Sequence, residues 1–153
     1  MKNYYCLGTS DSTTENAIDI LKRRLNEKKY PLYKKTPFLK DVKKDDEVVF
    51  YVAGRKNKSQ NFIGCSLIKS VEIPSETLVD PDKNKYVLEK YLLLENIVLF
   101  KAPIHIKAII NQLEFIKNKT NFGVYLMGGV SKITENDFNL IKNSWYKYSD
   151  YLA

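Results

Sequence analysis

The run Glu47-Val48-Val49-Phe50-Tyr51-Val52 is short, apolar and rich in β-branched and aromatic residues. Runs of this kind form β-strands. A basic segment from Gly54 to Gln60 follows, and then a second long apolar run from Phe62 to Ile73 that ends at Pro74. Two such runs joined by a short polar segment predict two strands connected by a hairpin-like loop.

The residues before this pair of strands predict a strand, a helix and a loop. Tyr4 to Leu7 is short, aromatic and apolar, which is typical of a strand. Ser12 and Glu15 have the spacing of a capping box that opens a helix. The apolar residues of that helix share one face, and they are Ala17, Ile18, Leu21 and Leu25. Tyr30 to Phe38 contains two prolines, which predicts an extended loop.

The second half of the chain predicts further strands and two helices. Tyr91 to Phe100 is expected to be a strand, Ile106 to Phe115 a helix, and Phe122 to Met127 a last short strand. Residues 80–84 predict a turn. The spacing of Thr134 and Asp137 resembles a helix cap, and the apolar stripe of the helix that follows is Phe138, Ile141 and Trp145. This order predicts an α+β fold with a mainly antiparallel sheet, in one domain over residues 1–153.

The positive charge of the chain is concentrated in one segment. Lys22 to Lys58 holds 13 basic and 5 acidic residues, a net charge of +8, while the rest of the chain holds 12 basic and 13 acidic residues. A basic patch attracts polyanions because binding releases their condensed counterions. The alternative interpretation is a solvated, lysine-rich surface without a partner.

The motifs of enzymes and metalloproteins are missing from the sequence. It has neither of the glycine-rich patterns that bind phosphate groups, and a single histidine, His105, lies in an apolar context. Cys6 and Cys65 lie in apolar runs, which indicates buried thiols. We therefore expect no catalytic residues, no metal and no cofactor. No stretch approaches the roughly 18 apolar residues of a membrane span, so we expect a cytoplasmic protein without a membrane partner.

Aromatic residues occur within the basic segment. Those in or beside it are Tyr30, Tyr33, Phe38, Phe50 and Tyr51. Aromatic rings among lysines and arginines suit a protein that stacks on bases and holds a phosphate chain. The alternative interpretation is that aromatic residues such as Phe50 and Phe62 belong to the barrel core, and we expect most of these rings to lie there. Tyr30, Tyr33 and Phe38, in the proline-containing loop, are the better candidates for contact with a ligand.

Several short motifs follow one another along the chain in a recognisable order. The segments concerned are Tyr4 to Ser10, Val42 to Tyr51, Phe62 to Gly64, Leu113 to Lys119, Asn121 to Gly123, Leu126 to Gly129 and Ile133 to Ile141. Their order and spacing resemble the EVE domain family, which is PUA-like and related to YTH domains. The resemblance covers nearly the whole chain. It implies a PUA-like pseudobarrel of mainly antiparallel strands with flanking helices.

The resemblance also implies a function. EVE domains resemble YTH domains in holding a modified base, such as a methylated cytosine or adenine, in an aromatic pocket, and they occur alone or as specificity parts of modification-dependent restriction systems. We therefore expect a non-catalytic module that binds nucleic acid, DNA ahead of RNA, and flips a modified base into its pocket. The alternatives are a regulatory or interaction domain that binds a small ligand, and an enzyme.

The expected site residues fall into two groups. Those expected to form the base-binding pocket are Thr9, Ser10, Tyr30, Tyr33, Phe38, Tyr51 and Phe122. Those expected to bind phosphates are Lys34, Lys35, Arg55, Lys56 and Lys58.

Overall fold

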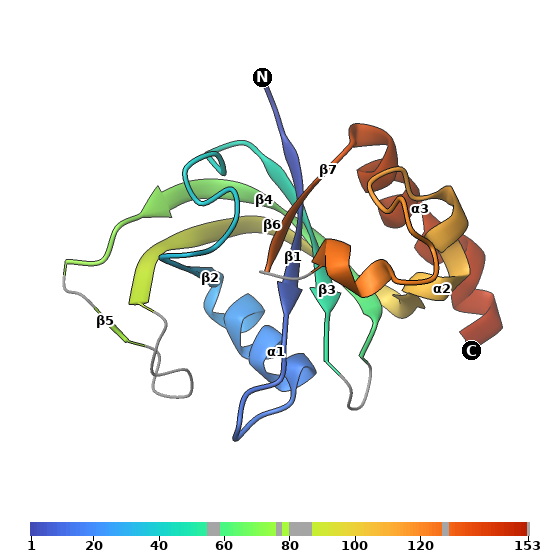
Figure 1. The fold of residues 1–153 in the computed structure, drawn as a ribbon, viewed down its shortest axis with the longest axis horizontal. Coiled ribbons are helices and arrows are strands. Elements are labelled where there is room, and N and C mark those ends of the chain that lie inside the picture. Colours follow the sequence, from blue (N-terminus) through green and yellow to red (C-terminus); the bar gives the residue numbers. More distant parts are fainter. Residues whose placement is uncertain (55–58, 76–77, 80–86, 127–128, 153) are drawn as a thin grey trace.

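The computed structural model describes residues 1–54, 59–75, 78–79, 87–126 and 129–152, with backbone alone at residues 78–79 and 145–152 (Figure 1). The turn expected at residues 80–84 lies outside this part of the chain. The elements are β1 (Tyr4–Thr9), α1 (Ala17–Glu27), β2 (Lys29–Tyr33), β3 (Glu47–Val52), β4 (Asn61–Glu72), β5 (Leu78–Val79), β6 (Val87–His105), α2 (Ile106–Ile109), η1 (Ile110–Gln112), η2 (Phe122–Leu126), β7 (Val130–Ile133) and α3 (Glu135–Leu152).

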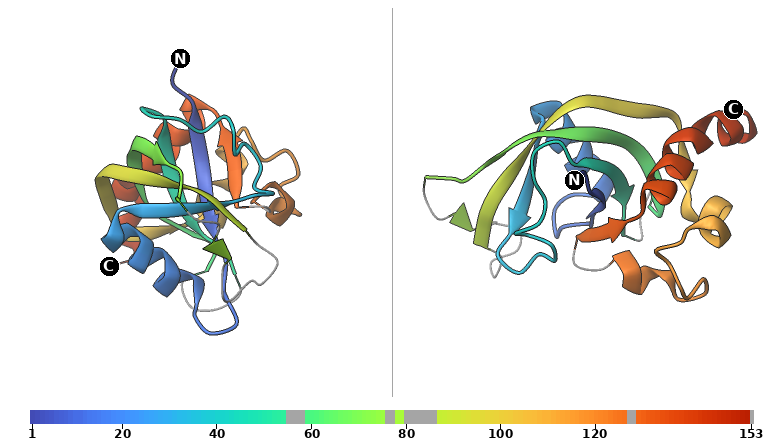
Figure 2. Two further views of the ribbon diagram at one scale, coloured as in Figure 1. Left: turned by 90° about the vertical axis from the view of Figure 1, so that its left-hand side faces the viewer. Right: turned by 90° about the horizontal axis from the view of Figure 1, so that it is seen from above.

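The strands of the described residues form one sheet in the order β2-β6-β4-β3-β1-β7, with β5 also paired to β6. β1 and β3 are parallel, and the other described pairs are antiparallel. The sheet curls strongly, with α1 near one end and α2 and α3 at the other (Figure 2). The predicted α+β class and mainly antiparallel pseudobarrel are confirmed, as is the pairing of the two strands on either side of Gly54 to Gln60.

The middle of the sheet is buried on both faces. Side chains of β1 and β3 alternate between two apolar clusters: Leu7 and Phe50 belong to the first cluster, with α1, and Cys6 and Tyr51 belong to the second, with α2 and α3. Strands covered on both faces have continuous apolar sequences rather than alternating ones. This explains why residues 48–52 of β3 form an unbroken apolar run.

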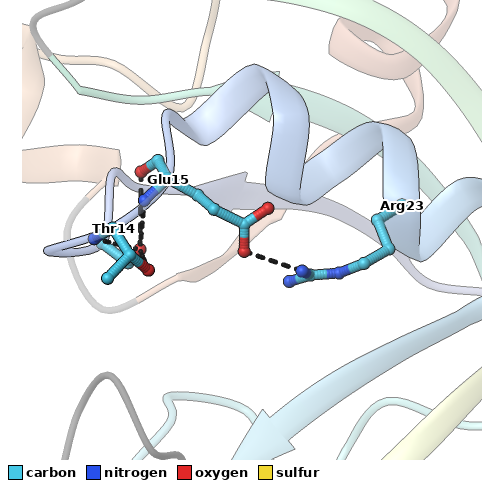
Figure 3. Close-up of polar contacts among 4 residues, drawn as sticks. Thr14, Glu15 and Arg23 are labelled. Carbon is cyan, nitrogen blue, oxygen red and sulfur yellow. Dashed lines mark hydrogen bonds and ion pairs between the residues drawn. The ribbon is translucent and has the colours of Figure 1, made fainter.

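The first helix has the predicted apolar face but not the predicted cap. Its residues Ala17, Ile18, Leu21 and Leu25 are all buried. Ser12 lies in a separate turn before the helix, where its Oγ accepts a hydrogen bond from the Glu15 N–H at 2.9 Å. The Glu15 carboxylate points away from that turn and pairs with Arg23 at 2.7 Å (Figure 3). The capping-box prediction was therefore wrong, because the Ser12 turn ends before α1 begins at Ala17.

The proline-containing segment starts as a strand rather than a loop. β2 pairs with β6 at the end of the sheet, and Pro31 lies opposite Tyr91. An edge position tolerates proline because one side of the strand needs no ladder hydrogen bonds. The predicted loop is thus limited to the residues after Tyr33. β6 also extends well beyond the predicted 91–100 range.

The C-terminal elements differ in part from the predicted ones. The helix expected from Ile106 to Phe115 is short, α2 followed by η1, because the backbone is extended at Leu113 and the Asp137 carboxylate accepts hydrogen bonds from the next two backbone N–H groups. Phe122–Leu126 is a 3-10 helix instead of a strand. Thr134 caps α3, as predicted, by accepting a hydrogen bond from the Asp137 N–H at 3.0 Å.

Gly64 on β4 provides a test of the close contact between β4 and β6. A Cβ added there would lie 2.4 Å from the Val98 carbonyl oxygen of β6, whereas a Cβ at Gly123 would meet nothing within 4 Å. Gly64→Ala should lower the free energy of unfolding by about 2–3 kcal/mol because the two strands must separate. Gly123→Ala, the control, should change it by less than about 1 kcal/mol. Urea unfolding followed by circular dichroism measures both, and equal midpoints for the two variants would contradict this account of the β4–β6 contact.

Buried thiol and phenol groups in the two clusters predict how the free energy of unfolding depends on pH. Burial raises the pKa of the Cys6 thiol above its ordinary 9.0, and burial also raises the pKa of the Tyr30 and Tyr51 phenols above their ordinary 10.0. Because the unfolded chain ionises near these ordinary values while the folded chain keeps its protons, the free energy of unfolding should be level below about pH 8 and fall above about pH 9. Each ionising group contributes up to about 1.4 kcal/mol per pH unit.

The pH prediction is checked by urea unfolding between pH 6 and 11. Cys6→Ala is the matched variant, and it should make the earliest part of the alkaline decline shallower, because only the Cys65 thiol then contributes there, while leaving the later, phenolic part. A stability profile that stays level up to pH 11 in the wild-type protein would contradict the burial of these groups.

Candidate nucleic-acid interface

The carboxyl ends of β1 and β3 meet at one edge of the sheet, at the lower side of the molecule in Figure 1. Parallel pairing causes this, since it sets Thr9 opposite Val52. The Ala53 N–H donates to the Thr9 carbonyl at 2.8 Å, and the Gly8 N–H donates to the Gly129 carbonyl at 2.7 Å. The loop after β1, the turn after β3 and the segment before β7 are therefore joined at this edge, which we call the β1–β3 edge.

Asp11 fixes the loop that leaves β1. Its Oδ1 accepts a hydrogen bond from the Ala17 N–H at 2.8 Å, at the first residue of α1. Gly54, with φ +113°, packs against the same carboxylate so closely that an added Cβ would lie 2.6 Å from Oδ2. The loop from Ser10 to Asn16 is thus held between the start of α1 and the turn after β3.

A chain of polar contacts connects Thr9 to α1 and β2. The Thr9 and Tyr30 hydroxyl oxygens are 2.9 Å apart, and the Tyr30 hydroxyl donates to the Gly8 carbonyl at 3.1 Å. Arg24 donates from Nη1 to Thr9 Oγ1 at 3.5 Å, and its guanidinium carbon lies 4.9 Å from the centre of the Tyr30 ring. Burial raises the pKa of Tyr30, and the nearby Arg24 charge and the Thr9 hydrogen bond partly oppose this rise.

The donors and acceptors of these hydrogen bonds can be assigned in one consistent way. A carbonyl can only accept, so Tyr30 uses its single hydroxyl hydrogen on Gly8. The Thr9 hydroxyl must then donate to the Tyr30 oxygen, and it accepts from Arg24. Thr9 and Tyr30 are also 2% and 3% exposed. Both side chains are therefore satisfied within the protein, and through them Arg24 is held at the β1–β3 edge.

Among the other predicted pocket residues, Ser10 and Tyr51 are placed near this edge by the backbone. Ser10 follows Thr9 directly and is exposed. Tyr51 lies opposite Gly8 but is 2% exposed, in the second cluster, with its ring 5.1 Å from that of Phe62. Phe122 is half-buried against the same cluster, at the start of η2. A contact of Tyr51 or Phe122 with a base remains a prediction.

Tyr33 and Phe38 lie elsewhere. Tyr33 is at the end of β2, half-buried and opposite Leu88 of β6. Phe38 has φ +58° and lies with its ring 5.9 Å from that of Tyr5. Because Tyr5 precedes Thr9 by four residues, it is about 13 Å from the β1–β3 edge along the strand. The structure does not bring Phe38 together with Thr9.

The predicted phosphate-binding residues are described only in part. Lys34 and Lys35 directly follow β2 and are exposed. Arg55, Lys56 and Lys58, which come between β3 and β4 in the sequence, lie outside the described residues. Their contact with phosphates stays a prediction, as does that of the two lysines.

Arg24 is the residue at this site that sequence reasoning missed. It was counted only as one of many basic residues. A signal was present: Arg24 follows Leu21 by three positions and Ala17 by seven, so it belongs to the buried face of α1 rather than to its solvent face. An arginine on an apolar helix face needs a partner inside the protein or a ligand.

The remaining reactive groups have structural roles. Cys6 and Cys65 are free, buried thiols, as predicted, and burial raises the pKa of each. His105 Nδ1 accepts a hydrogen bond from the Lys107 N–H at 3.1 Å and caps α2, and burial lowers its pKa. A hollow of about 200 Å³ between β4, β6 and α3 contains none of the predicted site residues.

Membrane-spanning helices and clusters of metal ligands are absent from the described residues. No helix there is both long and apolar enough to cross a membrane. No three histidine, cysteine or acidic side chains within the described ranges lie together as a metal site would need.

Comparisons with known proteins agree with this fold. UPF0310 protein PH1033 of Pyrococcus horikoshii is 31% identical over 110 residues, which are 68% of this chain and 76% of that protein. The structure of human THYN1 in complex with 5-methylcytosine containing DNA is similar over 94% of this chain and 98% of that chain, at 15% identity and TM-score 0.56. The N-terminal domain of Staphylothermus marinus McrB is similar over 92% and 93%, at 8% identity and TM-score 0.50.

The sequence itself matches a described family. Residues 5–144 match the EVE domain, so the match begins in β1 and extends into α3. It includes both strands that form the β1–β3 edge. On this match, and on the relative at 31% identity, the chain belongs to the EVE domain family.

Proposed function

We propose that this chain is a non-catalytic, nucleic-acid-binding domain that recognises a modified base, most simply a methylated one, at the β1–β3 edge. The observation that carries the proposal is the likeness to human THYN1, which was crystallised with 5-methylcytosine containing DNA and shares its fold with nearly the whole chain. DNA is proposed ahead of RNA for the same reason.

The charge distribution supports a nucleic-acid partner. The segment from Lys22 to Lys58 carries a net charge of +8 and includes Arg24 and the exposed Lys34 and Lys35. Several other basic side chains are used within the protein: Arg23 pairs with Glu15, and Lys43 pairs with Asp46. Lysines without such partners are suited to neutralise phosphates and release their counterions.

The β1–β3 edge supports recognition of one nucleotide. Ser10 offers an exposed hydroxyl next to Thr9, and Phe122, which is half-buried, provides aromatic surface from the second cluster. Extruding a base from a duplex costs a few kcal/mol. Stacking on an aromatic side chain returns about 1–3 kcal/mol per base. Arginine and serine then add hydrogen bonds that depend on which base is bound.

The reactive side chains favour binding over catalysis. The Cys6 and Cys65 thiols are buried with raised pKa values, so they stay protonated and unreactive at neutral pH. His105 uses Nδ1 in the cap of α2. We therefore propose that any chemistry on the bound nucleic acid comes from a partner, as in a modification-dependent restriction system. The likeness to an N-terminal domain of McrB supports a fold that works joined to other domains.

Binding to a matched panel of oligonucleotides tests the proposal. Each oligonucleotide carries one variable base, plain or methylated, in a constant sequence at constant salt. We expect about a 4-fold or larger preference for one methylated base, because burying the methyl group contributes about 0.8 kcal/mol while the base keeps its hydrogen bonds. Ser10→Ala should reduce affinity for that base about 5-fold, while Thr13→Ala, on an exposed residue of the same loop, should not. If the wild-type protein binds no oligonucleotide at low salt, the proposal fails, and a small ligand becomes the better candidate.

The two exposed lysines after β2 test the phosphate contacts separately. The double substitution Lys34→Gln and Lys35→Gln should weaken binding of all oligonucleotides by similar factors. It should also lower the slope of log affinity against log salt by about one for each phosphate that is no longer neutralised. Lys69→Gln, on an exposed residue of β4 outside the basic segment, is the control. An unchanged salt slope in the double variant would remove these lysines from the interface.

A further inference from the structure

Arg24 differs from the other described arginine in having no acidic partner. Arg23 pairs with Glu15 at 2.7 Å. Arg24 is half-buried, and within the described part of the chain no carboxylate lies at ion-pair distance from it. It donates one long hydrogen bond to Thr9, lies over the face of the Tyr30 ring and also interacts with the Tyr30 hydroxyl. A guanidinium carries several N–H donors in a fixed fork, so most of them remain available for a ligand.

The ring on which the guanidinium rests is also held in one place. The ring of Tyr30 is 3% exposed and lies 6.3 Å from that of Phe50 in a stacked arrangement, so it cannot follow a moving cation. Its hydroxyl is bonded to Gly8 and Thr9, and Thr9 accepts from Arg24. A donor fork fixed on a buried ring loses little freedom on binding, which favours a directional contact. Exposed lysines such as Lys34 and Lys35 suit the phosphate chain instead.

We propose that Arg24 determines which base the β1–β3 edge accepts, by donating two N–H groups to two adjacent acceptors on the edge of that base. This inference rests on the proposed function and narrows its ligand. Guanine presents O6 and N7 together, and cytosine presents O2 and N3. Adenine and thymine present no two adjacent acceptors on one edge, so they do not match the fork. The ligand is therefore a cytosine or a guanine, plain or methylated, and Thr9 and Tyr30 are positioning residues for Arg24.

The central experiment compares wild-type protein with Arg24→Lys and Arg24→Gln. Each is titrated with oligonucleotides that differ at one position, which carries cytosine, 5-methylcytosine, guanine, adenine, N6-methyladenine or thymine, at several salt concentrations. Each of these oligonucleotides is one arm of the experiment, and the cytosine and guanine arms identify which pair of base acceptors Arg24 contacts. Lys22→Gln, on an exposed residue of the same helix, controls for the loss of one charge.

We expect wild-type protein to prefer one of the cytosine or guanine arms. Arg24→Lys, which keeps the charge but not the fork, should lower affinity for that arm about 10- to 100-fold and the others much less, so that the preference collapses. Equal losses on all arms, with a salt slope reduced by about one, would identify a phosphate contact and overturn the inference. A wild-type preference for adenine or thymine, or an unchanged preference in Arg24→Lys, would also overturn it. Failure of wild-type protein to bind any arm is a different result and refutes the proposed function.

Thr9 allows a matched test of the positioning role. Thr9→Ser keeps the hydroxyl that accepts from Arg24, and Thr9→Val keeps the shape without it. The ratio of affinities between the preferred and the other arms should survive in the serine variant and fall in the valine variant. A general loss of stability would lower both affinities and leave this ratio unchanged. An unchanged ratio in Thr9→Val would therefore show that Thr9 does not position Arg24.

Discussion

The parallel pairing of β1 with β3 is the constraint on which the rest of this structure depends. Parallel neighbours need a crossover between them, and α1 and β2 occupy that connection. Because both strands lie in the middle of the sheet, their side chains must fill two clusters at once, one under α1 and one under α2 and α3. The same pairing brings the two carboxyl ends to one edge, so the arrangement that forms the cores also forms the candidate site.

Much of this fold could be predicted from local sequence patterns. The apolar run of β3 and the apolar face of α1 are strong signals, because each pattern depends only on residues within its own element. The signals that failed depended on distant partners. Pro31 predicts a loop unless β2 is known to be an edge strand that pairs only with β6. The helix after Ile106 ends early because the Asp137 carboxylate, far along the chain, accepts hydrogen bonds from the N–H groups that follow it. Local sequence contains neither fact.

The site was less predictable than the fold, and for a related reason. Composition identified a basic, aromatic segment, but it could not separate rings that face a ligand from rings that fill a core. Tyr30 is the clearest case: it lies among lysines in the sequence, yet it is buried and stacked against Phe50. Its burial becomes apparent only when β2 is placed in the sheet. The exposed position of Ser10 depends on where β1 ends, and the apolar pattern stops at Leu7 while the strand continues to Thr9.

Burial of Tyr30 is also what separates Arg24 from the other cations of the basic segment. An exposed lysine contributes charge, which acts over a Debye length and does not depend on orientation. A guanidinium resting on a buried ring contributes direction as well, because the ring and Thr9 define where its donors point. Charge without direction can attract any nucleic acid, and donors with a fixed direction can choose among bases. In the proposed function, affinity and selectivity therefore belong to different residues of the same segment, and only selectivity depends on how the core is packed.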